Sequence, residues 1–239
     1  MKTLKIVSMI AAVGAVVFFW NDIRAGVNNL ASNNNIQMSA AASGAKNEPA
    51  SGAVSVKQVW KLPEELLEIS GLSVIDNERF ACVQDEMGTV YIYNTNTSTV
   101  EKKIPFANPG DFEGIAVVDK TIWVVRADGL LFELDTDKKD IVAKEHKTSL
   151  TAKHNVEGLC YDEANQRLLL ASKDGDPGDS GTKGIYAFDL AQKKFIAEPV
   201  YNIRMSSDAA GGEKKKSKKQ GVKPSAIAVH PGSGELYIT

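Results

Sequence analysis

The chain has 239 residues, of which 28 are basic and 30 acidic, so its formal net charge is only −2. This is the composition of an ordinary globular protein with one large domain or two small ones, and a charge near zero gives no field that would attract nucleic acid. The two cysteines, Cys82 and Cys160, are too few for a disulfide scaffold; we expect both to be unbonded and buried.

Residues 1–25 have the pattern of an export signal. Lys2 and Lys5 precede an apolar run over residues 6–20, as in the basic and hydrophobic regions of a signal peptide. As a helix this run would be about 22 Å long, shorter than the roughly 30 Å hydrocarbon core of a bilayer. Length therefore favours a signal peptide, but residues 23–25 are a poor cleavage site, and an uncleaved anchor with its lysines on the cytoplasmic side is the alternative. We expect a protein that is periplasmic or secreted if cleaved, and held at the cell membrane if not.

Residues 26–56 are rich in Asn, Ala, Ser and Gly and follow neither a strand nor a helix period, which predicts a flexible stalk. From residue 57 onward short apolar runs alternate with turn residues, a pattern typical of strands. Within this region a unit recurs. Gly71, Gly114 and Gly158 stand 43 and 44 residues apart, and Ala226 takes the fourth place.

Each unit has a first strand, a tight turn, a second strand, a polar corner, a third strand and a more polar fourth strand. The expected first strands are residues 71–75, 114–118, 158–162 and 226–230, and the second are 79–83, 121–125, 167–171 and 235–239. The expected third strands are 89–93, 130–134 and 184–188, and the fourth are 99–104, 140–146 and 195–200. A single helical turn is expected over residues 63–68.

Four antiparallel strands in about 43 residues are typical of a β-propeller blade. A solenoid would have shorter repeats with parallel strands, and a β-sandwich with accidental similarity is the other alternative. We predict an all-β propeller domain over residues 57–239, with about 3.5 blades, as the N-terminal part of a six-bladed protein. A four-bladed ring closed by the segment near Val56 is a further alternative.

Two insertions lengthen the third unit, at residues 176–183 and 205–222. The second contains a lysine run over Lys214–Lys219, which usually indicates a solvated loop. Contact with a polyanion or a lipid headgroup is the alternative.

The candidate site follows from the repeat. First strands line the central channel of a propeller, so the turns that lead into them should meet at one end, which we call the channel mouth. Because residues i and i+2 of a strand share a face, two sets should meet there: Ser70, Glu113, Glu157 and Ser225, and Glu68, Asp111, Asn155 and Lys223. The corners after the second strands add Gln84, Asp85, Glu86, Arg126, Asp128, Lys173 and Asp174, for which ordinary turn chemistry is the alternative.

Several oxygen ligands around one axis are what Ca²⁺ requires. We therefore predict a Ca²⁺ site with the ligands Glu113, Glu157, Asp111 and Asn155. Two close carboxylates without a cation would repel and raise one pKa, although Lys223 could supply the positive charge instead. A structural salt-bridge network and a direct ligand or catalytic site are the alternatives. The sequence contains no recognisable nucleophile–base pair, so no catalytic residue is assigned.

Six motifs occur in a fixed order. They are Glu68-Ile69-Ser70-Gly71-Leu72, Gln84-Asp85-Glu86-x-Gly88, Gly110-Asp111-Phe112-Glu113-Gly114, Arg126-Ala127-Asp128-Gly129, Asn155-Val156-Glu157-Gly158-Leu159 and Lys223-Pro224-Ser225-x-Ile227-x-Val229-His230-Pro231. Over residues 58–239 this set resembles the SdiA-regulated family of bacterial exported β-propellers, which is related to phytase-like and lactonase-like propellers. The resemblance implies a six-bladed propeller at the cell envelope, with Ca²⁺ binding as an open expectation and no established reaction. This sequence departs from the family by ending before the blades that would complete the channel site.

We therefore expect a monomeric, exported propeller that binds a small molecule or an envelope partner at its channel mouth, together with Ca²⁺. It should have no nucleic-acid partner, and it would meet the membrane through its N-terminal segment if that is uncleaved. The alternative is a metal-dependent hydrolase of esters, lactones or phosphates, with Asp85, Arg126 or Lys173 near the substrate. Of the two, a binding module is favoured over an enzyme.

Overall fold

The computed structural model describes residues 58–175, 182–204 and 223–239. The predicted export signal, the predicted stalk and the lysine run lie outside these residues. Within the described part of the chain, no helix has the length and apolar character needed to cross a bilayer.

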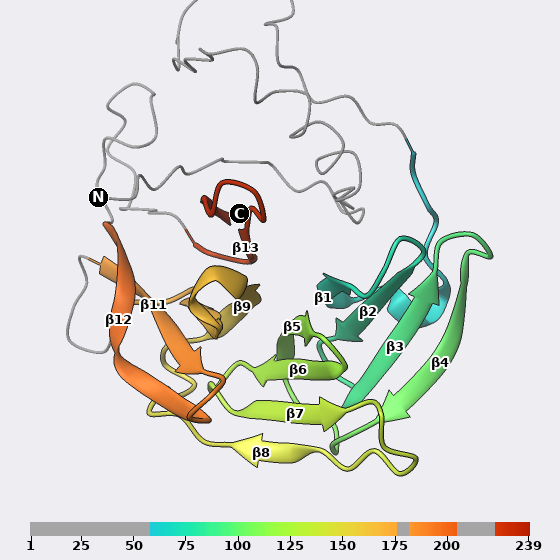
Figure 1. The fold of residues 1–239 in the computed structure, drawn as a ribbon, viewed down its shortest axis with the longest axis horizontal. Coiled ribbons are helices and arrows are strands. Elements are labelled where there is room, and N and C mark those ends of the chain that lie inside the picture. The colour runs from blue at the N-terminus through green and yellow to red at the C-terminus, as the bar shows by residue number, and fades with distance from the viewer. Residues whose placement is uncertain (1–57, 176–181, 205–222) are drawn as a thin grey trace, which may run out of the picture.

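Three four-stranded antiparallel sheets follow one another along the chain (Figure 1). The first blade contains β1 (Ile69–Val74), β2 (Arg79–Gln84), β3 (Thr89–Asn94) and β4 (Thr99–Pro105). The second contains β5 (Phe112–Val118), β6 (Thr121–Arg126), β7 (Leu131–Asp135) and β8 (Lys144–His146). The third contains β9 (Val156–Asp162), β10 (Arg167–Ser172), β11 (Thr182–Asp189) and β12 (Lys194–Arg204). A two-stranded sheet of β13 (Ile227–Val229) and β14 (Leu236–Ile238) comes last.

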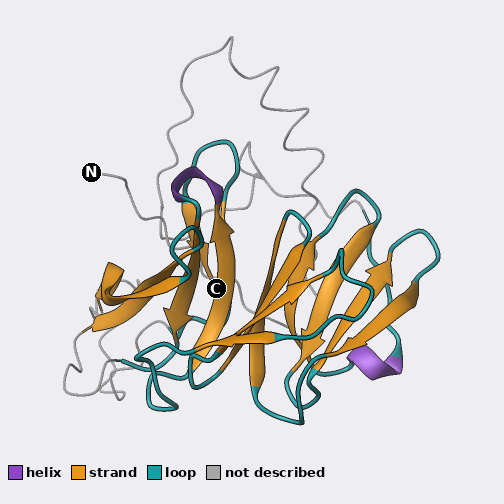
Figure 2. Ribbon diagram, turned by 60° about the horizontal axis from the view of Figure 1, so that its bottom comes forward, coloured by secondary structure: helices purple, strands orange, loops and turns teal. Residues whose placement is uncertain are grey.

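The blades are arranged as in a propeller. β1, β5, β9 and β13 lie innermost around a common centre, and β4, β8 and β12 lie outermost (Figure 1). Figure 2 shows the same sheets from another side, with short loops joining the strands and little helix. The helical segments of the described residues are single 3-10 turns, η1 (Glu64–Leu66) and η2 (Glu163–Asn165). The predicted all-β propeller with four-stranded blades is therefore confirmed.

Some strand boundaries differ from the prediction. The expected strand over residues 140–146 forms only at Lys144–His146; residue 140 belongs to the bend that follows β7, and residues 141–143 have no regular structure. The first strand of each full blade begins two residues earlier than expected. It remains paired with the second strand beyond an irregularity in the register, which lies just before the repeat glycine.

That irregularity is a β-bulge at the same position in each inner strand. In blade 2, Phe112 pairs with Arg126 and Gly114 with Val125, so Glu113 is the extra residue. The same step leaves Ser70 unpaired in blade 1 and Glu157 unpaired in blade 3. A bulge redirects a side chain and is common beside functional sites. Ser70, Glu113 and Glu157 therefore share a backbone conformation that differs from the rest of their strands.

The glycine after each bulge lets neighbouring inner strands approach closely. A Cβ on Gly114 would lie 2.8 Å from the backbone nitrogen of Leu159, and one on Gly158 would lie 2.7 Å from the Ile227 side chain. A Cβ on Gly71 would lie 3.1 Å from the Cα of Gly114. The glycine period therefore marks the contact of each inner strand with the next blade.

The hydrophobic core lies between the blades. One cluster packs Phe112 and Phe132 of blade 2 against blade 1, and a second packs Trp123 of blade 2 against Phe188 of blade 3. A third joins blade 3 to the last sheet through Ile227. Burying side chains of this size contributes about 1.5–3 kcal/mol each, so packing of blade on blade is the main stabilising term. Cys82 and Cys160 are unbonded, with Cys82 buried and Cys160 partly buried.

Candidate functional site at the channel mouth

Backbone hydrogen bonds fix the corner of one blade to the inner strand of the next. The N–H of Phe112 donates to the carbonyl of Asp85 over 2.9 Å, and the N–H of Val156 donates to the carbonyl of Ala127 over 2.9 Å. Phe112 lies between Asp111 and Glu113 in the chain. The corner of blade 1 is thus held directly against the acidic stretch of blade 2.

Asp111 and Glu113 face each other, as their spacing predicts. Burial raises the pKa of Glu113 to about 8, and a hydrogen bond to the Asp111 side chain and the charge of Glu157 act in the same direction. Lys173 opposes this rise only in part. A carboxyl group that is partly buried beside other acids keeps its proton to a higher pH, because its ionised form is poorly solvated and repelled. Near neutral pH, Glu113 therefore carries a proton.

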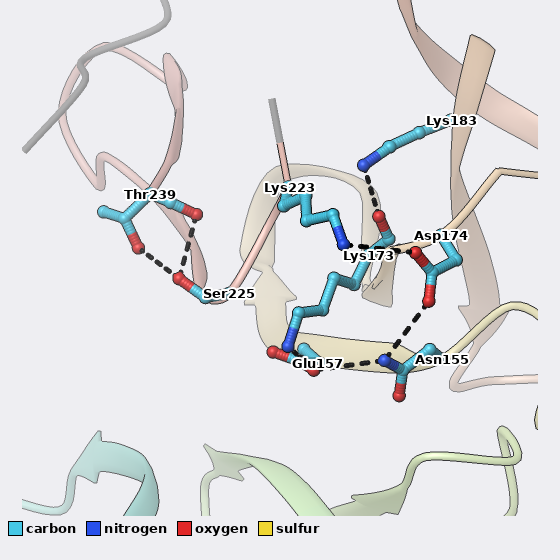
Figure 3. Close-up of polar contacts among 8 residues, drawn as sticks. All are labelled: Asn155, Glu157, Lys173, Asp174, Lys183, Lys223, Ser225 and Thr239. Atoms are coloured by element: carbon cyan, nitrogen blue, oxygen red, sulfur yellow. Dashed lines mark hydrogen bonds and ion pairs between the residues drawn. The ribbon is translucent and has the colours of Figure 1, made fainter. Parts of the chain in front are cut away.

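Blade 3 contributes a network of mixed charge (Figure 3). Glu157 is buried and forms an ion pair with Lys173, which comes from the corner after β10. The Asn155 amide donates to Glu157 over 3.3 Å and to Asp174 over 3.4 Å. Asn155 has a φ of 48°, a left-handed conformation that asparagine tolerates better than most residues. The hydrogen bond to Glu157 raises the pKa of Lys173, so this lysine is charged.

Two further lysines lie on the same side. Lys223, which precedes β13, is exposed and its ammonium lies 3.9 Å from Asp174. Lys183, in β11, is only 3% exposed and donates from its ammonium to the backbone carbonyl of Lys173. Burial lowers the pKa of Lys183.

The structure thus brings Asp111, Glu113, Glu157, Asn155, Lys173 and Lys223 into one connected region. Other predicted residues serve local contacts. Ser70 donates to the carbonyl of Phe112 over 2.6 Å, so it joins blades 1 and 2. Ser225 donates to the carbonyl of Thr239 within the last sheet.

Arg126 and Asp128 pair with each other through two hydrogen bonds of 3.0 and 2.7 Å. Glu68 and Glu86 have exposed side chains, and their carbonyls accept hydrogen bonds from the backbone of Asp85 and Gly110. Arg126 and Asp128 thus pair within their own corner, and Glu68 and Glu86 contribute to the corner of blade 1 through their backbone carbonyls.

Asp85 is different from its neighbours at the corner. Its Oδ1 atom is buried and has no hydrogen-bond partner among the described residues. A buried polar atom without a partner is uncommon and points to a water molecule or an ion. Asp85 therefore adds a third acidic position next to Asp111 and Glu113.

Asp174, which was expected among the corner residues, connects Asn155 to Lys223. Lys183, which donates to the carbonyl of Lys173, was not among the predicted site residues. A signal for Lys183 exists in the sequence. Continuing the register of β10 and β11 places it opposite Lys173, where the first two blades have Gly88 and Gly129.

The arrangement is acidic on the side of blade 2 and of mixed charge on the side of blade 3. Among the described residues, no group of three or more His, Cys, Asp and Glu side chains is arranged to hold a metal ion as it stands. In this arrangement a proton on Glu113 and the ammonium of Lys173 compensate only two of the three carboxyl groups of Asp111, Glu113 and Glu157. A cation would have to replace one or both.

A scan against protein-family models and a search of curated proteins find no match for the sequence. Among solved structures, the chain is similar to the β-propeller domain of Cps50 (Swd1) from Myceliophteria thermophila, with 13% identity and a TM-score of 0.45 over 72% of this chain and 48% of that one. Hydrazine synthase from Kuenenia stuttgartiensis is 14% identical, with a TM-score of 0.46 over 77% and 44% of the two chains. Glutaminyl cyclase from Myxococcus xanthus is 18% identical, with a TM-score of 0.46 over 72% and 67%.

The chain therefore spans less than half the length of the first two of these proteins. Likenesses at this distance carry no functional information. The propeller fold is established here by the chain's own blades.

Proposed function

We propose that this protein is an envelope propeller of the SdiA-regulated type, exported through its N-terminal segment, which binds a ligand at the channel mouth with the help of Ca²⁺. The ion would be held by Asp111 and Glu113 of blade 2 and by Glu157 and Asn155 of blade 3. The observation that carries the proposal is the gathering of carboxyl groups from two neighbouring blades with too little positive charge to balance them.

The donor set fits a hard cation. Ca²⁺ takes about six to eight oxygen ligands in flexible geometry, and carboxylate and amide oxygens are what these four side chains offer. The buried, unpartnered Oδ1 of Asp85 supports the same conclusion. Asp85 is linked by its carbonyl to the residue between Asp111 and Glu113, so its carboxylate is a further candidate ligand.

Ca²⁺ would compete with two charges of the protein itself. Since burial and neighbouring acids raise the pKa of Glu113 to about 8, an ion that binds at pH 7 must release the proton of Glu113. It must also draw Glu157 away from Lys173. Affinity should therefore rise with pH up to about 8 and level off above it.

Calorimetric titration of the protein with CaCl₂ at pH 7, in two buffers of different ionisation enthalpy, tests this proposal. We expect binding with release of about one proton per ion, and a higher melting temperature with Ca²⁺. The double variant Glu113→Gln with Glu157→Gln should lose both effects. Glu133→Gln is the matched control, because Glu133 is a partly buried glutamate of the same blade that lies outside this site. Absence of binding in the wild type, or equal binding in the double variant, would refute the Ca²⁺ site.

The geometry favours binding over hydrolysis. Of the three residues that a hydrolase was expected to use, Lys173 is paired with Glu157 and Arg126 with Asp128, so the charges of both are already engaged within the protein. A panel of ester, lactone and phosphate substrates, assayed with saturating Ca²⁺, should show no turnover. Turnover that disappears in the double variant would support the hydrolase instead.

A further inference from the structure

The join between blade 3 and the last sheet differs from the two joins before it. At the first two, an N–H of the inner strand donates to the corner carbonyl of the preceding blade, from Phe112 to Asp85 and from Val156 to Ala127. In the repeat, the position of Phe112 and Val156 is occupied by Pro224. Proline has no backbone N–H.

The packing of the inner strands shows that this sequence alignment also holds in the structure. A Cβ on Gly114 would meet Leu159, the residue after Gly158, and a Cβ on Gly158 would meet Ile227, the residue after Ala226. Ala226 therefore takes the place of the repeat glycine in the last unit. The last sheet therefore docks on blade 3 in the same register. Pro224 lies where a hydrogen bond to the corner carbonyl would otherwise form.

The corner carbonyl at this join is that of Lys173, and its hydrogen bond comes from the ammonium of Lys183 (Figure 3). Lys183 is 3% exposed, which is rare for a lysine. A buried ammonium is costly unless it is hydrogen-bonded. The carbonyl that lacks its backbone donor thus gains a charged one.

We propose that Lys183 is a positioning residue, which replaces the hydrogen bond that Pro224 cannot donate and so fixes the Lys173 corner with its ammonium on Glu157. Lys173 is then held in place as the internal competitor of any cation at Glu157. The link to ligand affinity rests on the proposed function; the role of Lys183 in the corner does not.

A double-mutant cycle between Lys183→Met and Pro224→Ala tests the proposal without any ligand. Lys183→Met should lower the folding equilibrium constant about tenfold or more, because it leaves a carbonyl without a donor. In the Pro224→Ala background, where a backbone N–H is available, the same change should cost less than about threefold. Chemical denaturation of the four variants measures both effects.

Pro231→Ala is the matched control, since Pro231 lies in an exposed turn, and its effect should add to that of Lys183→Met. If Lys183→Met alone does not fold, recovery of folding on adding Pro224→Ala supports the proposal, and failure to recover contradicts it. An equal cost of Lys183→Met in both backgrounds would also overturn it, because Lys183 would then be an ordinary core residue.

Calcium titration of the same variants tests the link to the ligand. Lys183→Met and Lys173→Met should each raise the Ca²⁺ association constant about threefold or more, and together no more than Lys173→Met alone. If no variant binds Ca²⁺, the proposed function fails, while the denaturation cycle still decides the role of Lys183. Binding that Lys173→Met strengthens and Lys183→Met leaves unchanged would contradict the positioning role.

Discussion

Two glutamates of blade 2, Glu113 and Glu133, are both partly buried but meet opposite surroundings. Burial, together with the neighbouring acids Asp111 and Glu157, raises the pKa of Glu113 to about 8. Burial also opposes ionisation of Glu133, but hydrogen bonds from Lys193 and His146 outweigh it and hold the pKa of Glu133 below its usual value. The protein thus supplies enough positively charged partners for the carboxylate of Glu133 and too few for that of Glu113.

Glu133 is the centre of a contact between blades 2 and 3, made with His146 and Lys193, which we call the clasp. Its two oxygens lie 2.6 Å from His146 of β8 and 2.6 Å from Lys193, which is in the turn before β12. The Lys193 ammonium also lies 4.4 Å from the centroid of the Trp123 ring, within the range of a cation–π contact. Every charge here has a partner from the chain itself, so the clasp has a structural role. The channel mouth lacks this balance, and the proposed external ligand would supply the missing charge.

The largest expected effect comes from breaking the clasp. Glu133→Gln should lower the free energy of unfolding at pH 7 by about 2 kcal/mol, because charge-assisted hydrogen bonds to Lys193 and His146 are weakened. Urea denaturation measures this loss. The pKa of Glu133 is lowered in the folded state, so its contribution to stability is complete at neutral pH and is lost as the pH falls from 4.5 through the lowered pKa of the folded protein. A variant as stable as the wild type at pH 7 would show that the clasp contributes nothing.

The corresponding substitution at the channel mouth, Glu113→Gln, should raise the free energy of unfolding instead of lowering it. The folded protein holds the proton of Glu113 up to a pKa of about 8, whereas the unfolded chain releases it near 4.5. Stability is therefore lost as pH rises between these values. Glu113→Gln, which cannot ionise, should be more stable than the wild type at pH 9 and indistinguishable from it at pH 4. For a fully buried group a pKa shift of this size would correspond to about 5 kcal/mol, but solvent screens the half-buried Glu113, so we expect a gain of only about 1 kcal/mol at pH 9. Denaturation at both pH values without Ca²⁺ checks this, and a loss of stability at pH 9 would remove the distinction between the two glutamates.

The smallest expected effect concerns Lys193. Its side chain is 38% exposed, so solvent screens its ion pair with Glu133. Lys193→Met should lower the free energy of unfolding by less than about 1 kcal/mol, and the loss should shrink further at 1 M salt. Lys194→Met, at an exposed neighbour, is the control and should have no effect. A large, salt-independent loss would mean that packing on Trp123, rather than charge, secures the clasp.

Sequence periodicity alone predicts the blades, because Gly71, Gly114 and Gly158 each lie where neighbouring inner strands approach closely: a Cβ would clash at Gly114 and Gly158 and be tightly packed at Gly71. It also brings Asp111, Glu113 and Glu157 to the channel mouth, since their place in the unit fixes their place on the axis. The bulges could not be predicted in this way, because they change the pairing and not the residue pattern.

The side-chain contacts between different blades could not be predicted from the sequence either. Glu133 and Lys193 are 60 residues apart and belong to no motif, so only the docking of blade 3 on blade 2 brings them together. The pairing of Lys173 with Glu157 depends on the direction of one corner, which the structure links to Lys183. Such contacts follow from three-dimensional packing and have no local signal.

The most direct test of the account is a carboxyl ¹³C NMR titration that follows Glu113 and Glu133 in the same sample, with and without Ca²⁺. We predict that Glu113 titrates near pH 8 without Ca²⁺ and at a clearly lower pH with it, while Glu133 titrates below its usual 4.5 in both conditions. A midpoint for Glu113 near 4.5, or a raised midpoint that Ca²⁺ does not lower, would contradict the assignment of the channel mouth as a cation-dependent binding site.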